Sequence, residues 1–165
     1  ESEIGKGSEF YFSIPDAIQI KENDLAQKII SIPKAPCEIK NLKILVTEDD
    51  NISRMLILKV LEEFGNEILI AYTGVEAVEI CQKNSDLDLI LMDIQMPQMN
   101  GYEATKEIRK FNKDVIILAQ TAYALEGDKA KTIAVGCNGY ISKPIKKEEL
   151  SNLLQHYFCN QENLN

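Results

Sequence analysis

Five short apolar runs, each followed by a segment with helical periodicity, constrain the fold of this chain more than any other feature of its sequence. The runs are LKILVT at 42–47, EILIAY at 67–72, LDLILMD at 87–93, DVIILAQ at 114–120 and GYIS at 139–142. The segments predicted as helices are 51–65, 73–84, 101–111, 125–136 and 146–158. Strands that are apolar along their whole length are typical of a parallel sheet covered by helices on both faces. We therefore predict an α/β fold with a doubly wound, five-stranded parallel sheet.

Residues 1–41 do not follow this alternation. The stretch GKGSEFYFSIP at 5–15 alternates around Phe10 and Phe12, which predicts a lone strand. The following residues are mixed and charged, with two prolines close together, which predicts a linker. The predicted organisation is a strand remnant at 1–15, a linker at 16–41, a domain at 42–158 and a C-terminal tail at 159–165.

The composition narrows the classes of partner. The chain has 165 residues, which suits one domain and a tail, and 45% of them are hydrophobic. A net charge of −8 disfavours nucleic acid or an anionic membrane as the main partner of this chain. No run reaches the ~18 apolar residues of a membrane span, and no signal peptide opens the sequence. We therefore expect a cytoplasmic protein.

The cysteines do not form a metal-binding pattern. The sequence contains no C-x-x-C pair, and its only histidine is His156, so a set of zinc ligands is not expected. The four cysteines, which we expect to be free thiols in a reducing compartment, are Cys37, Cys81, Cys137 and Cys159.

Charged and polar residues stand at the ends of the predicted strands. In a doubly wound sheet, ligands bind beyond the carboxyl ends of the strands, near the point where the strand order reverses. We therefore expect these side chains to gather at one edge of the sheet. In chain order they are Glu48, Asp49 and Asp50 after the first strand, Asp93 at the end of the third, Thr121 after the fourth and Lys143 after the fifth.

The chemistry of this set predicts a phosphoryl-transfer site. Carboxylates placed close together raise one another's pKa unless a cation intervenes, and Glu48, Asp49 and Asp93 suit Mg²⁺. Such an ion and Lys143 would offset the charge of a phosphoryl group, and Thr121 could donate its hydroxyl to a phosphoryl oxygen. Asp93 would then be the nucleophile.

Helix capping is the alternative explanation for acids that precede a helix. Asp50 fits both capping and a role in the site. For Asp93, capping is disfavoured because the next predicted helix begins only at 101.

Four motifs carry a family resemblance. They are ILVTEDDNISRMLI, LILMDIQMPQMNGYEA, LAQTAYA and GYISKPI, in this order and at suitable spacing. With them, residues 42–158 resemble the receiver domain of two-component signalling, of the response-regulator type. The resemblance implies a flavodoxin-like fold. Asp50 and Asn100 depart from the usual wording of the motifs, since Asn and Asp respectively are common there.

The resemblance also implies a role for each site residue. Asp93 would accept a phosphoryl group from a phosphohistidine of a sensor kinase dimerisation domain, in cis or in trans. The Mg²⁺ ligands would be Glu48, Asp49, Asp93 and the backbone carbonyl of Gln95. The residues that bind phosphoryl oxygens would be Thr121 and Lys143.

Tyr140, three residues before Lys143, matches the aromatic switch position of the family. If Thr121 moves toward the phosphoryl group, Tyr140 can turn inward behind it. The surface formed by 125–136, 139–142 and 146–158 would then change. The alternative is that Tyr140 is only a half-buried aromatic residue of the strand.

The N-terminal stretch at 5–15 resembles the last strand of a histidine-kinase ATP-binding domain. Its position before a receiver implies that the chain is the C-terminal part of a hybrid histidine kinase. This part lacks the ATP site and would catalyse only phosphotransfer to its own aspartate and slow autodephosphorylation. A histidine phosphotransfer protein or an effector domain would be a further partner.

Three other functions fit the site less well. A Mg²⁺ phosphatase with an aspartate nucleophile would need a second acid two residues after Asp93, where Gln95 stands. A degenerate receiver that acts only as a binding module would not need the full set of acids, Thr121 and Lys143. In a flavin-binding domain, the acids would repel the phosphate of the cofactor.

Overall fold

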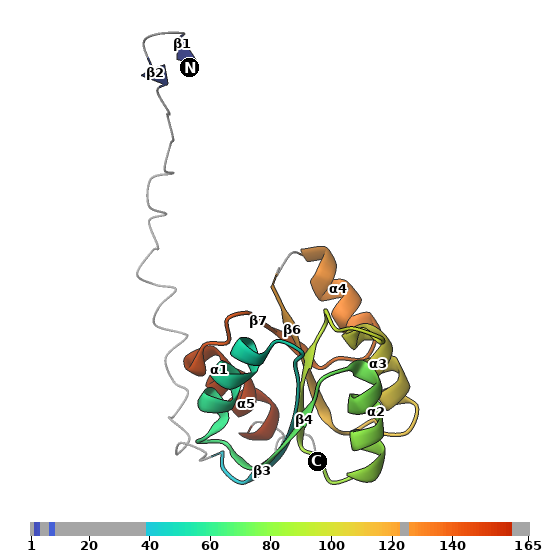
Figure 1. Ribbon diagram of the computed structural model, residues 1–165. Helices are drawn as coiled ribbons and strands as arrows, with labels where there is room; N and C mark the ends of the chain where they lie inside the picture. Colours follow the sequence, from blue (N-terminus) through green and yellow to red (C-terminus); the bar gives the residue numbers. More distant parts are fainter. Residues whose placement is uncertain (1, 4–6, 9–38, 123–125, 160–165) are drawn as a thin grey trace, which may run out of the picture. The chain divides into compact units, whose positions relative to one another are not determined.

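The computed structural model describes residues 2–3, 7–8, 39–122 and 126–159, with the side chains of 39–122 and 130–159 (Figure 1). The chain divides into two units, Glu1–Pro36 and Cys37–Asn165. In the first unit, β1 (Ser2–Glu3) pairs antiparallel with β2 (Gly7–Ser8). The greater part of the strand predicted at 5–15 and nearly all of the linker predicted at 16–41 lie outside the described residues.

The second unit contains a five-stranded parallel sheet in the order β4-β3-β5-β6-β7, which confirms the predicted doubly wound fold. Its strands are β3 (Leu42–Thr47), β4 (Gly65–Ala71), β5 (Leu89–Asp93), β6 (Ile116–Thr121) and β7 (Gly139–Ser142). The chain moves from β3 outward to β4 and then returns to the other side of β3 as β5. The strand order therefore reverses at β3 and β5, and their carboxyl ends meet at the switch point.

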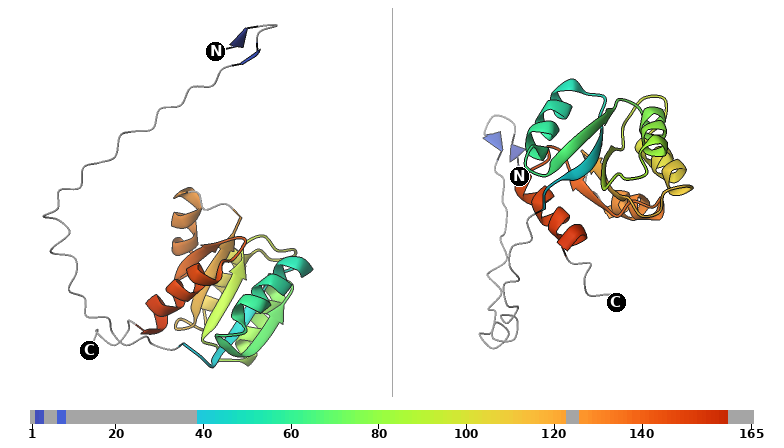
Figure 2. Two further views of the ribbon diagram at one scale, coloured as in Figure 1. Left: turned by 90° about the vertical axis from the view of Figure 1, so that its left-hand side faces the viewer. Right: turned by 90° about the horizontal axis from the view of Figure 1, so that it is seen from below.

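Helices cover both faces of this sheet (Figures 1 and 2). Residues of α1 and α5 pack into one apolar cluster, and residues of α2 and α3 pack into another on the opposite face. Alternate residues of each strand contribute to the two clusters, as the two-residue period of a strand requires. The helices are α1 (Asn51–Leu61), α2 (Gly74–Lys83), α3 (Gly101–Arg109), α4 (Glu126–Ala134) and α5 (Lys147–Cys159).

Side-chain caps define where three helices begin. The side chain of Asp50 accepts a hydrogen bond from the Ser53 amide at the start of α1, so Asp50 is an N-cap residue. Thr73 caps α2 in the same way, and Asn100 forms a capping box with Glu103 at the start of α3. These bonds satisfy amide groups that have no partner within the helix. They therefore fix where the chain enters α1 after β3 and where it enters α3 after β5.

The predicted helix 51–65 is too long at its C-terminal end. The helix α1 ends at Leu61, and the amide of Phe64 donates to the carbonyl of Leu61 in a tighter turn. The amide of Leu42 donates to the carbonyl of Phe64, so the start of β3 holds this turn. Gly65 therefore already belongs to β4 instead of ending the helix.

The loop after β5 packs against the strand through a glycine. An added Cβ at Gly101 would clash with the backbone carbonyl oxygen of Asp93, so no other residue fits there without a shift of the backbone. The Gly101 amide donates to the carbonyl of Ile94 at 3.1 Å. The start of α3 is thus held directly against the strand end that carries Asp93.

The expectation of four free thiols is wrong at Cys159, which is disulfide-bonded. Cys81 and Cys137 are free and buried, and burial raises the pKa of both thiols. Cys37 lies outside the described residues. Within the described part of the chain, no helix is long and apolar enough to cross a membrane.

Candidate functional site

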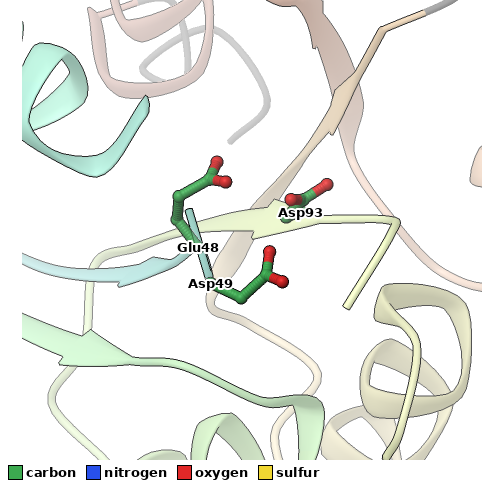
Figure 3. Close-up of side chains that lie close together, drawn as sticks. All are labelled: Glu48, Asp49 and Asp93. Atoms are coloured by element: carbon green, nitrogen blue, oxygen red, sulfur yellow. The ribbon is translucent and has the colours of Figure 1, made fainter. Parts of the chain in front are cut away.

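Three carboxylates meet at the carboxyl edge of the sheet, as the sequence predicts (Figure 3). Glu48 and Asp49 directly follow β3, and Asp93 is the last residue of β5. One oxygen from each carboxylate lies within 4.8 Å of the others. Glu48 and Asp93 are buried, with 1% and 4% of their surface exposed, whereas Asp49 is exposed. The cluster is therefore open to solvent on the side of Asp49.

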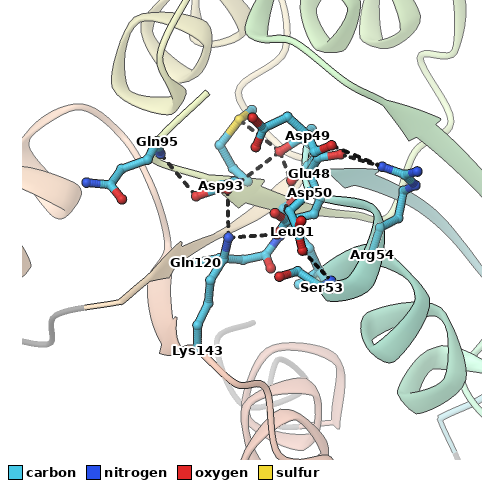
Figure 4. A network of polar contacts seen from close by, with 12 residues as sticks. Glu48, Asp49, Asp50, Ser53, Arg54, Leu91, Asp93, Gln95, Gln120 and Lys143 are labelled. Carbon is cyan, nitrogen blue, oxygen red and sulfur yellow. Dashed lines mark hydrogen bonds and ion pairs between the residues drawn. The ribbon is translucent and has the colours of Figure 1, made fainter. Parts of the chain in front are cut away.

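Lys143 joins the two buried acids (Figure 4). Its Nζ lies 2.6 Å from Asp93 Oδ2 and 2.7 Å from Glu48 Oε2. Burial disfavours the charged ammonium, but these two partners outweigh burial and raise the pKa of Lys143. Burial also raises the pKa of Glu48, and the nearby Lys143 offsets part of that rise. The structure thus places one cation between two carboxylates that have little access to water.

The acids fit a second, divalent cation. Apart from its ion pair with Lys143, Glu48 Oε2 has no hydrogen-bond partner among the described residues. Three carboxylates face one ammonium group here, so negative charge remains in excess. Oxygen ligands with an open, solvated side are what Mg²⁺ prefers in proteins. Gln95, the fourth residue predicted to bind the metal, donates its amide to Asp93 Oδ1 at 3.0 Å.

A cavity of about 210 Å³ lies beside the acid cluster. It brings together three residues that the sequence predicts to take part in phosphoryl transfer: Asp93, Thr121 and Lys143. Thr121 is the last residue of β6 and is half-buried. The residues that line the cavity are Asp93, Ile94, Gln95, Tyr102, Gln120, Thr121, Ala122 and Lys143.

Tyr140 does not line this cavity. It lies in β7, next to Ala119 of β6, and it is half-buried against the apolar cluster that contains α2 and α3. Tyr140 is therefore close to Thr121 along the sheet, but it belongs to the packed layer behind the site.

Arg54 supports the acidic pair, although no motif in the sequence indicates this role. From the first turns of α1, its Nη1 donates to the carbonyl of Glu48 at 3.1 Å. The guanidinium carbon lies 4.6 Å from the centre of the Tyr72 ring, a cation–π distance. The sequence shows only that a basic residue lies in the helix after the acids. Whether that residue contacts the backbone of Glu48 depends on how α1 packs.

The fold and this cluster define a class of protein. A doubly wound parallel sheet that gathers acids, a lysine and a threonine at its switch point is the architecture of a receiver domain. Residues 44–155 match the family model of the response regulator receiver domain, which is more than half of the chain. The chain therefore belongs to this family and contains a receiver domain of a two-component phosphorelay.

Curated relatives include sensor kinases. The chain is 34% identical over 160 residues to the autoinducer 2 sensor kinase/phosphatase LuxQ of Vibrio vulnificus. That match covers 95% of this chain and 18% of LuxQ. The chain spans less than a fifth of the length of the curated relatives that it matches.

Solved structures give the same classification. One similar structure is the receiver domain of the sensor histidine kinase PA1611 from Pseudomonas aeruginosa, with a magnesium ion in its active-site cleft. It is 35% identical, with a TM-score of 0.64 over 71% of this chain and 97% of that chain. A second comes from a complex of the Saccharomyces cerevisiae histidine phosphotransfer protein Ypd1 with the receiver domain of Ssk1. It is 33% identical, with a TM-score of 0.69 over 77% of this chain and 95% of that chain.

The charge balance at Lys143 leads to a stability prediction. Replacing Lys143 with Met should lower the free energy of unfolding by about 3 kcal/mol in metal-free buffer, because two buried carboxylates lose their cation. Lys147→Met is the matched control, since Lys147 pairs with Glu63 at 2.6 Å where both side chains are more than half exposed. This control should cost less than about 1 kcal/mol. Chemical denaturation measures both values, and equal losses would contradict the assignment.

Proposed function

We propose that Asp93 is the phosphoacceptor of this receiver and takes its phosphoryl group from a phosphohistidine. The observation that carries the proposal is the buried Asp93 carboxylate, held by Lys143 at a cavity that Thr121 also lines. A carboxylate oxygen of Asp93 attacks the phosphorus atom, and the bond from phosphorus to the imidazole nitrogen breaks. The electron pair stays on the imidazole, and Asp93 becomes an acyl phosphate.

Two residues assist this step. The ammonium of Lys143 already lies 2.6 Å from Asp93, so it can offset negative charge on the transferred group without moving far. The hydroxyl of Thr121 can donate a hydrogen bond to a phosphoryl oxygen within the cavity. Both roles need only short movements of side chains that the fold already gathers.

We also propose that the site binds Mg²⁺ through Glu48, Asp49, Asp93 and the backbone carbonyl of Gln95. When bound, the ion would offset charge on the phosphoryl oxygens. Two observations support the ion: the excess of carboxylates over ammonium groups in the cluster, and the magnesium in the cleft of the PA1611 receiver.

The wider context of the domain is part of the proposal. We infer that the receiver comprises residues 42–158 and that the chain is part of a hybrid histidine kinase. The match to LuxQ supports this inference because it covers 95% of the chain and therefore extends beyond the receiver itself. The donor would be the phosphohistidine of a kinase dimerisation domain, in cis or in trans. A histidine phosphotransfer protein is a further partner, as in the Ypd1 complex.

The surface beside Asp93 suits a protein donor. Three apolar residues of α1 are strongly exposed: Ile52 at 71%, Met55 at 64% and Leu56 at 56%. Leu56 also lines a shallow groove with Lys143, the same lysine that lines the Asp93 cavity. Exposed apolar surface of this kind marks a binding face. A phosphohistidine protein that docks on α1 would bring its histidine to Asp93.

Labelling with a small donor tests the phosphoacceptor. Incubation with acetyl phosphate and Mg²⁺ should add one phosphoryl group, seen by mass spectrometry, and Asp93→Asn should abolish it. Asp50→Asn is the matched control, because Asp50 caps α1 and asparagine is an equally good cap. Labelling of Asp93→Asn at the native level would refute the assignment, and loss of labelling in EDTA is expected from the metal site.

A second test addresses the α1 surface. Leu56→Ser should slow transfer from a phosphorylated histidine phosphotransfer protein by roughly 10-fold, equivalent to about 1.4 kcal/mol of binding. Labelling by acetyl phosphate should stay at the native rate because that donor needs no docking surface. Phe111→Ser removes an exposed apolar residue that lies after α3, away from α1, and should change neither rate. Equal slowing with both donors would show that the effect is not one of docking.

We propose further that Thr121 and Tyr140 transmit phosphorylation to the surface formed by α4, β7 and α5. A phosphoryl group on Asp93 adds acceptor oxygens beside Thr121. Movement of Thr121 would open space behind β6, which the half-buried Tyr140 can fill from the neighbouring strand. The receiver would then have two states whose populations depend on phosphorylation.

Amide chemical shifts test this switch. Addition of beryllofluoride and Mg²⁺ should shift resonances of β7 and α5 as well as those beside Asp93. In Thr121→Val, which lacks the hydroxyl, the changes near Asp93 should persist while those in α5 shrink. Changes that never extend beyond the neighbours of Asp93 in the native chain would exclude the switch.

A further inference from the structure

Thr47 anchors the backbone of Asp93 from the neighbouring strand. It is the last residue of β3, directly before Glu48, and it is fully buried. The register between β3 and β5 ends at the pair of Thr47 with Met92, so Asp93 lies one residue beyond it. The amide of Asp93 donates instead to Thr47 Oγ1 at 2.9 Å. A side-chain hydroxyl therefore takes the place of a strand carbonyl at the residue that carries the reactive carboxylate.

The hydroxyl of Thr47 is held in place as an acceptor. Thr47 Oγ1 donates its own hydrogen to the carbonyl of Leu91 at 3.0 Å, and the sulfur of Met92 lies 3.4 Å away. The lone pairs of the oxygen thus remain available to the Asp93 amide. Valine has the same shape without the hydroxyl, so this arrangement depends on one atom.

Gln120 reaches the same residue from β6. It is fully buried and pairs with Asp93 in the sheet register. Its Nε2 donates to the carbonyl of Thr47 at 3.3 Å, which links β6 to β3 across the intervening β5. Thr121 follows Gln120 directly, and Glu48 follows Thr47. Thr47 and Gln120 therefore connect the strand ends that carry the acids, the proposed phosphoacceptor and the threonine.

Gln120 is a poor choice for packing alone. Leu118, two residues earlier on the same face of β6, belongs to an apolar cluster. Gln120 Oε1 has no hydrogen-bond partner among the described residues, although it is buried. A buried amide oxygen without a partner destabilises the fold, and an apolar side chain would avoid that loss. A polar residue that breaks the local pattern beside a reactive site indicates a functional constraint.

We propose that Thr47 and Gln120 are positioning residues for phosphoryl transfer to Asp93. They hold the ends of β3, β5 and β6 at the spacing that the reaction needs, through their hydrogen bonds to the Asp93 amide and to the Thr47 carbonyl. A reaction needs its reacting groups to be placed within a fraction of an ångström. The contacts that support those groups determine whether this precision is reached. The inference rests on the proposed role of Asp93 and adds the residues that place its carboxylate.

The test compares rates of labelling by acetyl phosphate at saturating Mg²⁺. Thr47→Val should label at roughly one tenth of the native rate, within the range known for small misplacements of reacting groups. Thr47→Ser keeps the hydroxyl and should recover most of the native rate. In Thr47→Val, hydrogen exchange of the Asp93 amide should also be faster, because that amide has lost its acceptor.

Gln120→Met separates positioning from stability. Methionine fills a similar volume without an unpaired oxygen, so thermal unfolding should occur at the native temperature or above it. Labelling should nevertheless be several-fold slower, because the link from β6 to β3 is gone. Thr105→Val is the control for loss of a buried hydroxyl, since Thr105 is fully buried and its Oγ1 lies 3.6 Å from Cys137 Sγ. This control should label at the native rate.

Each outcome decides the proposal. Native labelling rates in both Thr47→Val and Gln120→Met would overturn it, and so would equal slowing in Thr47→Ser and Thr47→Val. Slowing in Thr105→Val to the same degree would show that general loss of stability causes the effect. If the native chain itself is not labelled at Asp93, the proposed function fails. That outcome is distinguishable from the outcomes of the variants, which are all measured relative to a labelled native chain.

Discussion

The ion pairs of Lys143 with Glu48 and Asp93 are the contacts on which the rest of the site depends. Two carboxylates are almost removed from water at the end of an apolar sheet, where burying an unpaired charge is costly. One ammonium between them reduces this cost and leaves the exposed Asp49 as additional negative charge. The remaining negative charge supports the proposed divalent cation, and the position of Lys143 beside Asp93 supports its proposed contact with a phosphoryl group.

The backbone around this cluster is held from several directions. Gly101 lets the start of α3 approach the Asp93 carbonyl, and Arg54 binds the carbonyl of Glu48 from α1. Thr47 and Gln120 add hydrogen bonds between strand ends. These supporting contacts come from different helices and strands, so the geometry of the site depends on the packing of the whole domain. A substitution at any one of the contacts can therefore change that geometry.

Much of the site could be predicted because its residues lie at fixed places in a repeating pattern. The strand–helix alternation indicates a parallel sheet, and such a sheet must bring the carboxyl ends of its strands to one edge. Position alone therefore predicts which residues gather at this edge, and the structure brings them together: Glu48, Asp49, Asp93, Thr121 and Lys143. Asp50 could not be resolved in the same way, because capping and metal binding favour the same residue at the same place; its bond to Ser53 establishes the cap.

Local periodicity and the handedness of crossovers are enough to predict the sheet, its helices and the residues at its carboxyl edge. The hydrogen-bond and ion-pair partners of those residues depend on how the folded chain packs. Thr47 and Gln120 look like ordinary strand residues in the sequence, and their bonds to Asp93 and across β5 exist only when three strands are in register. The early end of α1 at Leu61 has the same cause, since the turn that stops it is held by the first residue of β3. Contacts between segments far apart in the chain carry no local pattern, so the folded structure alone reveals them.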